Sequence, residues 1–465
     1  MIVSINPATA QEIARFSVDT PAEVERALAA GAQAQRAWGR LPVTARLPLL
    51  RSLARLLREG CAAHAALITA EMGKPVAEAR AEVEKCALTC DFYAEHATAF
   101  LADRETPSSA ARSAVVHDPL GVVLAIMPWN YPFWQVFRFA APALAAGNGA
   151  VLKHAANVGL CARAIADLFR QAGAPPGLFQ VLMVEAAAVA GLIDDPRIAA
   201  VTLTGSTEVG ALVAAQAGRA LKKQVLELGG SDPFIVLADA DVEGAAEVAV
   251  KARFVNAGQS CVNAKRFIVE EPVAEAFVEA FSRRVAVLTV GDPTDPATDI
   301  GPMARANLRE TLHDQVTRTL GAGAMLRLGG APVEGPGFFY APTILDRVTP
   351  EMAAFREETF GPVAAIVRAR DVEHALALAN DTEFGLAASI WTGDERRAVQ
   401  LARRIEAGAV FVNGLVASDP RLPFGGIKRS GYGRELGELG IREFTNVKTL
   451  WIGPAATAPV QAAVE

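Results

Sequence analysis

Residues 199–210 read AAVTLTGSTEVG, an apolar run that passes directly into a glycine turn. The segment Glu208–Ala217 then continues with helical spacing of its apolar residues. A short strand that turns through glycine into a helix is the repeating unit of parallel α/β sheets. This stretch therefore predicts an α/β fold built on parallel strands.

The same alternation extends to both sides of this stretch. The predicted strands are Gly121–Met127, Ala150–Lys153, Phe179–Val184, Ala199–Thr204, Gln224–Leu228 and Pro233–Leu237. Between them, Trp134–Ala146 and Leu160–Ala172 have helical spacing. Strands and helices that alternate in this way predict a doubly wound parallel sheet.

A second series of alternating elements follows Cys261. Its predicted members are Arg266–Val269, Ala274–Val287, Val363–Arg368, Val372–Ala379, Ser389–Trp391, Glu395–Ile405 and Ala409–Asn413. Two such series, with a polar loop between them, predict two α/β domains and an interdomain cleft.

The N-terminal part is predicted to be helical. Thr20-Pro21-Ala22-Glu23 combines an N-cap, a proline at the first helical position and a capping-box glutamate. Helical spacing continues through Leu47–Leu57, Cys61–Met72 and Ala77–Phe100. Cys86 and Cys90 lie one turn apart, either as a buried stripe, which we favour, or as a redox or metal pair.

Composition excludes several classes of protein. The 465 residues are 51% hydrophobic and 21% charged, as in a globular enzyme. A net charge of -6 gives no basic surface for nucleic acid, and no apolar run is long enough to span a membrane. The tail Ala455–Glu465 is rich in Ala and Pro, and we expect it to be frayed.

The cysteines and histidines indicate a reduced, metal-free protein. The N-terminus lacks the basic and apolar regions of a secretory signal. Five cysteines, an odd count, fit free thiols in the cytoplasm. The six histidines have no metal-ligand spacing, so no metal site is expected.

Three residues are candidates for the chemistry. Cys261 lies in the polar, glycine-containing loop GQSC, which suits a nucleophile better than a buried stripe does, although a cysteine taken alone is more often structural. Asn130 lies between two prolines in PWNYP, a rigid display for an oxyanion donor or simply a turn asparagine. Glu227 ends an apolar strand before two glycines, as a general base or a partnered buried acid.

Other residues suit a phosphate or a ribose. Gly205, Ser206 and Gly210 lie where a strand enters a helix, and the amides of such a turn can bind phosphate, although many such glycines serve geometry alone. Lys153 ends a strand, where it can bind ribose or phosphate or remain a solvated charge.

Together these motifs resemble the aldehyde dehydrogenase superfamily, over nearly the whole chain. The motifs, in order, are PWN at 128–130, Lys153, GSTEVG at 205–210, LELGG at 226–230, GQSC at 258–261, EETFGP at 357–362 and PFGG at 423–426. Seven motifs in this order are a specific signal.

The resemblance implies NAD(P)+-dependent oxidation of an aldehyde to a carboxylic acid. The Cys261 thiolate would attack the carbonyl to form a thiohemiacetal, whose oxyanion Asn130 would stabilise. Oxidation would leave a thioester, and Glu227 would activate the water that hydrolyses it. The implied cofactor-binding residues are Met127, Pro128, Trp129, Lys153, Ala156, Gly205, Ser206, Gly210, Leu228, Glu358 and Phe360.

Within the superfamily, the chain is most similar to bacterial succinate-semialdehyde dehydrogenases, which share its KHA and WQVFR motifs. Arg138 and Ser418 occupy the positions that bind the substrate carboxylate there, and Gln135 is a further polar candidate. The alternative is that Arg138 pairs with a neighbouring acid. Val255 replaces a second arginine that many of these enzymes carry, so glutarate semialdehyde and neutral aldehydes stay open as substrates.

Ala156 bears on the choice of dinucleotide. NAD-preferring relatives often carry a glutamate there, and its absence removes repulsion of a 2′-phosphate. We therefore expect NAD(P)+ without ranking the two forms.

The resemblance also implies the domain organisation. Residues 1–100 and 120–229 would form a Rossmann-type NAD(P)-binding domain, 230–443 a catalytic domain, and 101–119 with 444–465 an oligomerisation segment and tail. Arg112–Pro119 and Phe444–Gly453 would form a β arm that supports a homodimer or homotetramer. The rival reading from another class is a non-catalytic binding protein with this fold.

Overall fold

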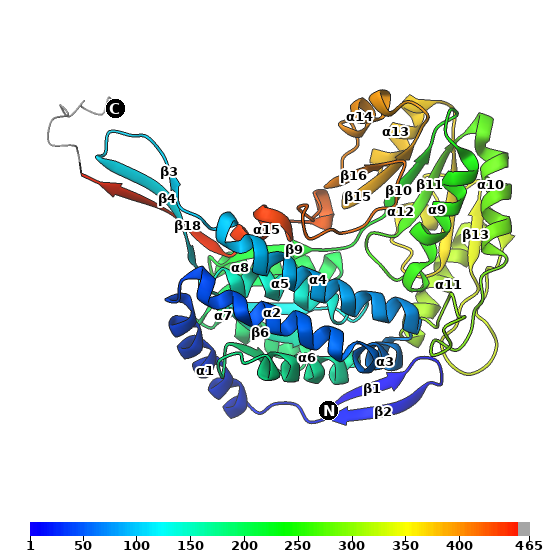
Figure 1. Ribbon diagram of the computed structural model, residues 1–465. Helices are drawn as coiled ribbons and strands as arrows, with labels where there is room; N and C mark the ends of the chain where they lie inside the picture. Colours follow the sequence, from blue (N-terminus) through cyan, green and yellow to red (C-terminus); the bar gives the residue numbers. More distant parts are fainter. Residues whose placement is uncertain (454–465) are drawn as a thin grey trace.

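Two large, mostly parallel sheets make up the body of the chain, and a small antiparallel arm extends from it (Figure 1). The computed structural model describes residues 1–453, so the Ala/Pro-rich tail 455–465 lies outside the described residues. The predicted α/β class, with two parallel-sheet layers and a β arm, is confirmed.

The first sheet has the order β17-β9-β8-β5-β6-β7. Its strands are β5 (Val122–Met127), β6 (Gly149–His154), β7 (Phe179–Val181), β8 (Ile198–Thr204), β9 (Lys223–Glu227) and the antiparallel β17 (Gly431–Tyr432). The chain winds outward from β5 to β7 and then continues from β8 on the other side. Such a reversal creates a crevice at the carboxyl ends of the two inner strands, where ligands bind.

Helices cover both faces of the first sheet. One face packs against α1 (Pro21–Gly39), α7 (Val189–Asp194) and α8 (Thr207–Arg219). The other packs against α2 (Val43–Glu59), α3 (Cys61–Met72), α4 (Val76–Phe100), α5 (Trp134–Ala145) and α6 (Gly159–Gln171). The capping box of Thr20 and Glu23 is present at the start of α1, as predicted. Cys86 and Cys90 are fully buried, which confirms the apolar stripe.

One N-terminal element was not expected. Residues before α1 form a hairpin of β1 (Ile2–Asn6) and β2 (Gln11–Phe16). The turn places Ala10 at φ 59°, a conformation that glycine or asparagine usually marks in a sequence. Without that signal the hairpin is difficult to recognise.

The second sheet has the order β12-β13-β14-β11-β10-β15-β16. Its strands are β10 (Asp232–Val236), β11 (Ala264–Glu270), β12 (Met325–Leu328), β13 (Thr343–Asp346), β14 (Val363–Ala369), β15 (Ala387–Trp391) and β16 (Ala409–Val412), and only β12 pairs antiparallel. The helices α9 (Val242–Phe254) and α10 (Glu271–Val285) pack on one face. The helices α11 (Ala306–Gly321), α12 (Ala353–Arg356), α13 (Val372–Asn380) and α14 (Glu395–Ala402) lie on the other.

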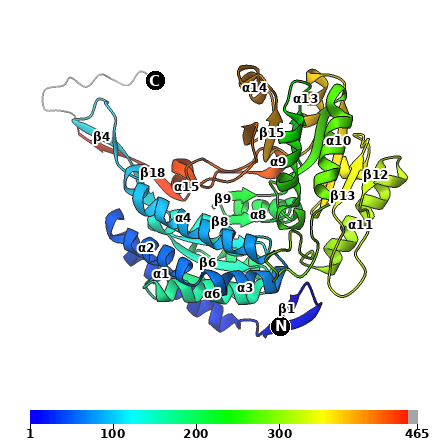
Figure 2. The ribbon, with the colours of Figure 1, turned by 45° about the vertical axis from the view of Figure 1, so that its right-hand side comes forward.

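The arm consists of β3 (Arg104–Glu105), β4 (Arg112–Pro119) and β18 (Thr445–Ile452). It projects from the body in both ribbon views (Figures 1 and 2). The strands β4 and β18 pair along eight residues each, as the sequence predicted for an arm of these two segments. Val447, Leu450, Trp451 and Ile452 on β18 remain exposed.

The segment before β18 returns to the first sheet. Gly431 pairs with Glu227, and α15 (Gly437–Glu443) packs against α4 and α5. Residues 431–443 therefore pack with the first layer, whereas the sequence-based division groups them with the second. No helix within residues 1–453 combines the length and apolar character needed to cross a membrane.

Candidate active site

The loop that carries Cys261 has a distorted backbone. After α9, the short helix η3 (Val255–Gly258) places Asn256, Ala257 and Gly258 in the left-handed region, at φ 56°, 51° and 72°. A Cβ on Gly258 would overlap the backbone of Gly361, so only glycine fits there. This strained turn directs the chain from α9 toward Cys261. Strained backbone conformations of this kind are common at functional sites.

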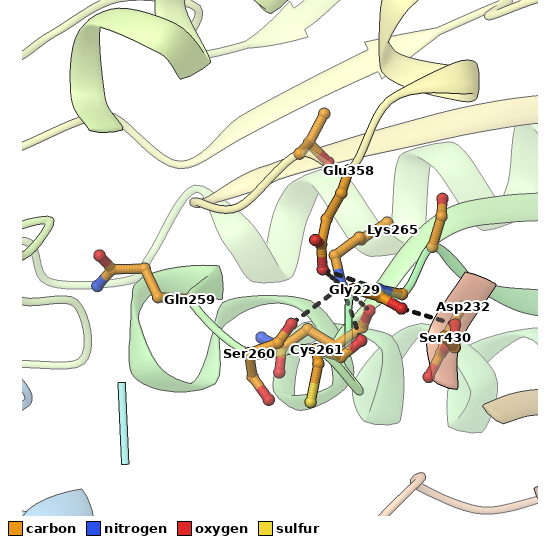
Figure 3. Close-up of polar contacts among 12 residues, drawn as sticks. Gly229, Asp232, Gln259, Ser260, Cys261, Lys265, Glu358 and Ser430 are labelled. Carbon is orange, nitrogen blue, oxygen red and sulfur yellow. Dashed lines mark hydrogen bonds and ion pairs between the residues drawn. The ribbon is translucent and has the colours of Figure 1, made fainter. Parts of the chain in front are cut away.

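Lys265 holds this loop from within the protein. Its ammonium donates to the carbonyl oxygens of Ser260 and Cys261, both at 2.9 Å, and of Asn263 at 3.3 Å. It also lies 3.5 Å from a carboxylate oxygen of Glu358. Figure 3 shows Lys265 between Glu358 and the backbone of the loop that carries Cys261. The sequence analysis did not select this residue, because a lysine in a strand reads as an exposed charge.

Asn130 lies beside the same loop. Its side-chain amide donates to the carbonyl of Gln259, two residues before Cys261, at 3.1 Å. In return, Asn256 donates to the carbonyls of Asn130 at 2.9 Å and Gln259 at 3.0 Å. The structure thus brings the Asn130 amide to the loop that carries the Cys261 thiol, although the two residues are far apart in the sequence.

Glu227 is buried at the end of β9, and within residues 1–453 neither of its carboxylate oxygens has a hydrogen-bond partner. Burial, with Glu435 adding to it, raises the pKa of Glu227 above its usual range. Arg138 forms an ion pair with Glu435, and its charge opposes that rise. A carboxyl group in this setting holds its proton to higher pH than an exposed one and can act as a base near neutrality.

Cys261 is half-buried and lines a cavity of about 260 Å³. This is below the usual size of pockets for drug-sized ligands, so it favours a small substrate. Burial raises the pKa of the Cys261 thiol to about 12, while the charges of Arg138 and Lys265 oppose the rise. The resting thiol is therefore protonated and needs a base to become a nucleophile.

The three residues predicted to bind substrate also line this cavity: Gln135, Arg138 and Ser418. Gln135 is buried, and its side-chain oxygen has no partner within residues 1–453. Arg138 has the acidic partner that the sequence left open as an alternative, and its Nη2 also donates to Thr204 at 3.3 Å. Lys85 from α4, which was not among the candidates, contacts Ser418 at 2.7 Å in the same cavity.

A second group lies at the carboxyl edge of the first sheet. Met127 ends β5, and Pro128 and Trp129 follow it. Gly205 and Ser206 follow β8, and the Ser206 side chain caps α8. The edges of β5 and β8 are adjacent at the reversal of strand order, so these residues meet in the crevice. Ala156 begins the short helix η1 (Ala156–Val158) beyond β6.

Lys153 lies next to the end of β6 and is half-buried. Within residues 1–453 it forms neither a hydrogen bond nor an ion pair, and burial lowers its pKa. The Trp129 ring meets Phe360 edge-on, with the ring centres 5.9 Å apart. These side chains bring a free cation and an aromatic surface to the crevice.

Glycines keep this edge open. A Cβ on Gly210 would overlap the side chain of Leu228, so glycine allows α8 to pack closely on the strand. A Cβ on Gly229 would lie 2.7 Å from Oε2 of Glu358, and the other carboxylate oxygen, Oε1, accepts from the Gly230 amide at 3.0 Å. A helix N-terminus, an unpaired lysine and an acceptor carboxylate fit the phosphates and ribose of a dinucleotide. No cluster of metal-ligating side chains is found in the described part of the chain.

Comparisons with known proteins agree with this geometry. Residues 1–450 match the model of the aldehyde dehydrogenase family. The chain is 52% identical over 449 residues to succinate semialdehyde dehydrogenase [NAD(P)+] of Escherichia coli, with 97% of each chain covered. It is 48% identical over 462 residues to succinate-semialdehyde dehydrogenase [NADP(+)] of Mycolicibacterium paratuberculosis, again with 97% of each covered.

A solved structure is similar throughout. The crystal structure of succinic semialdehyde dehydrogenase from Streptococcus pyogenes, in complex with NADP+, has a TM-score of 0.95 and 36% identity, covering 97% of this chain and 100% of that one. Family match, sequence identity and fold agree over almost the entire length. The chain belongs to the aldehyde dehydrogenase family.

Proposed function

We propose that this protein oxidises succinic semialdehyde to succinate with NAD(P)+, through a covalent adduct on Cys261. The observation that carries the proposal is the cavity itself. Cys261, on the loop that the Asn130 amide contacts, lies in its wall, and the cations Lys85 and Arg138 line it as well. Such a cavity suits a small molecule with an aldehyde at one end and a carboxylate at the other.

The first step is attack by sulfur. Glu227 accepts the thiol proton, and the Cys261 Sγ–C bond forms as the carbonyl π electrons move onto oxygen. The Asn130 amide and the backbone N–H of Cys261 stabilise that oxyanion. Lys265 keeps the loop in place through its bonds to the carbonyls of Ser260 and Cys261.

The dinucleotide would be held at the carboxyl edge of the first sheet. The residues proposed to hold it are Met127, Pro128, Trp129, Lys153, Ala156, Gly205, Ser206, Gly210, Leu228, Glu358 and Phe360. When bound, it accepts the two electrons and the hydrogen that leave the substrate carbon. The small side chain of Ala156 is compatible with either form of the dinucleotide, and the two relatives are named for NAD(P)+ and NADP+.

The last step releases the acid. A Cys261 thioester is attacked by water, and Glu227 takes the proton from that water as the new C–O bond forms. Cys261 then leaves as a thiolate and recovers its proton. Because burial raises the pKa of Glu227, the carboxyl group can exchange protons near neutral pH.

The substrate assignment rests on the relatives' names and on the polar end of the cavity. Gln135, Arg138 and Ser418 are proposed to surround the carboxylate. Glutarate semialdehyde is one methylene longer and is the nearest alternative, and a neutral aldehyde would make no use of these groups. The non-catalytic reading is disfavoured because Cys261, Asn130 and Glu227 are all present.

The domain roles and assembly belong to the same proposal. The first layer would bind the dinucleotide, the second would carry the catalytic loop, and the arm would join subunits into a homodimer or homotetramer. The exposed Leu450 and Trp451 support this use of the arm, since β18 offers an apolar edge. The five free thiols are compatible with the cytoplasm. Light scattering of Trp451→Asp would test assembly, with a smaller particle expected than for the wild type.

The activity test compares two aldehydes with both dinucleotides. Succinic semialdehyde carries the carboxylate, and butyraldehyde has the same chain length without it. A large preference for succinic semialdehyde supports the substrate, comparable rates support only a general aldehyde, and no turnover by folded protein contradicts the enzymatic proposal.

A further inference from the structure

Resting on this proposed function, we propose that the ammonium of Lys85 and the hydroxyl of Ser418 together bind the distal carboxylate of the substrate. Lys85 comes from α4, and Ser418 from the loop after β16, so the two meet only in the folded chain. Both line the same cavity as Cys261.

The contact between Lys85 and Ser418 leaves N–H and O–H donors free to bind an anion. The Lys85 ammonium has three N–H groups and no acceptor, so it must donate the 2.7 Å bond to Ser418 Oγ. The hydroxyl hydrogen of Ser418 is then free to donate elsewhere. Lys85 also lies over the Trp134 ring, 4.3 Å from its centre. These two contacts hold the ammonium and leave at least one N–H beside the Ser418 O–H for an anion.

Lys85 differs from the other cations in the cavity in its counter-ion and its exposure to solvent. Arg138 already has the carboxylate of Glu435. Lys251 lines the cavity but is exposed to solvent. Lys85 is half-buried, and within residues 1–453 no carboxylate lies within ion-pair distance of it. A partly desolvated cation without a counter-ion gains most from a carboxylate ligand.

The groups around Lys85 set its protonation. Arg138 faces it from α5, Glu82 and Cys86 from α4, and Asp419 from the same loop as Ser418. Burial, reinforced by the charge of Arg138, lowers the pKa of Lys85 to about 8. Lys85 therefore carries its charge at neutral pH and loses it above about pH 8, and the grip on a carboxylate should weaken over that range.

The test compares Lys85→Met with Lys251→Met, a matched control from the same cavity wall. For Lys85→Met we expect kcat/KM to fall roughly 10- to 100-fold with succinic semialdehyde, the loss expected for a charge-assisted hydrogen bond. With butyraldehyde it should change less than about threefold, which also shows that the variant is folded. Lys251→Met should leave both values near wild type.

The pH dependence supplies a second readout. The ratio of kcat/KM for succinic semialdehyde to that for butyraldehyde cancels the titrations of Cys261 and Glu227, which both substrates share. In the wild type this ratio should fall above about pH 8. In Lys85→Arg the fall should disappear, because a guanidinium stays charged.

Binding without turnover separates this inference from the proposed function. Succinate should slow alkylation of Cys261 in the wild type but not in Lys85→Met, whether or not any aldehyde is oxidised. An equal loss with both aldehydes would mean a structural role, and unchanged selectivity or unchanged succinate protection would place the carboxylate elsewhere. Either result overturns the assignment of Lys85. Absence of aldehyde oxidation by the wild type, with succinate protection intact, would overturn only the proposed function.

Discussion

The side-chain amide of Asn130 donates a hydrogen bond to the carbonyl of Gln259, at 3.1 Å. This bond joins the loop after β5, in the first sheet, to the loop that carries Cys261. The two partners of this bond are 129 residues apart in the sequence, and the bond connects the proposed oxyanion donor to the loop of the proposed nucleophile.

The first prediction concerns this amide. Asn130→Ala should lower kcat about 100- to 1,000-fold, the usual cost of losing one oxyanion donor. The rate of Cys261 alkylation should change little, since the thiol itself remains. A comparable loss in the rate of alkylation would mean that Asn130 only maintains the loop. Asn130→Asp cannot donate a hydrogen bond in its ionised form, so it should be no more active than Asn130→Ala.

Lys265 provides a test of loop electrostatics. Its charge lowers the pKa of Cys261, so Lys265→Met should shift the pH midpoint of Cys261 alkylation upward. The variant also leaves three loop carbonyls without their donor and Glu358 without its cation, and it should lose roughly 3 to 5 kcal/mol of stability. An unchanged midpoint in folded protein would contradict the electrostatic role. Lys222→Met, a lysine remote from the loop, is the control.

Glu227 should control both turnover and its pH dependence. Its pKa is raised, so the basic form increases as pH rises through neutrality, and turnover should increase with it. Glu227→Gln should reduce steady-state turnover about 100- to 10,000-fold and remove this rising limb. If turnover by Glu227→Gln still increased with pH as in the wild type, the increase would belong to another titrating group.

The cysteines should divide by exposure. Cys86, Cys90 and Cys161 are buried, and burial raises the pKa of each. They should resist alkylation until the protein unfolds. Cys61 is half-buried like Cys261, so Cys61→Ser is the suitable background in which to follow alkylation of the Cys261 thiol. Peptide mapping that found Cys161 modified first in native protein would contradict this order.

The sequence predicted much of the fold, because local patterns carry it. The strands around residues 199–210 have the alternation typical of parallel sheets, and Thr20 with Glu23 marks a helix start that the structure contains. The helix α11, the strands β12 and β13 and the N-terminal hairpin were not predicted. The two strands are only four residues long, α11 has no side-chain cap at its start, and the hairpin turn has Ala10 in place of glycine.

Sequence patterns could not predict those site residues whose roles depend on contacts between segments far apart in the chain. Lys85 has the spacing of a solvated helix residue, and only its bond to Ser418, 333 residues later, reveals it. Lys265 likewise has no distinguishing local pattern, and only the fold places its ammonium against the carbonyls of the Cys261 loop. The pairing of Arg138 with Glu435 depends on the return of the chain through β17, which no local pattern predicts.

Capture of the acyl intermediate tests the central claim most directly. The wild-type protein would be mixed with succinic semialdehyde and NADP+, quenched in acid within the first turnover and analysed by peptide mass spectrometry. The proposed mechanism predicts a succinyl group on the peptide containing Cys261, removed by hydroxylamine as expected for a thioester. Oxidation of the aldehyde without any adduct on Cys261, or with the adduct on another residue, would contradict it.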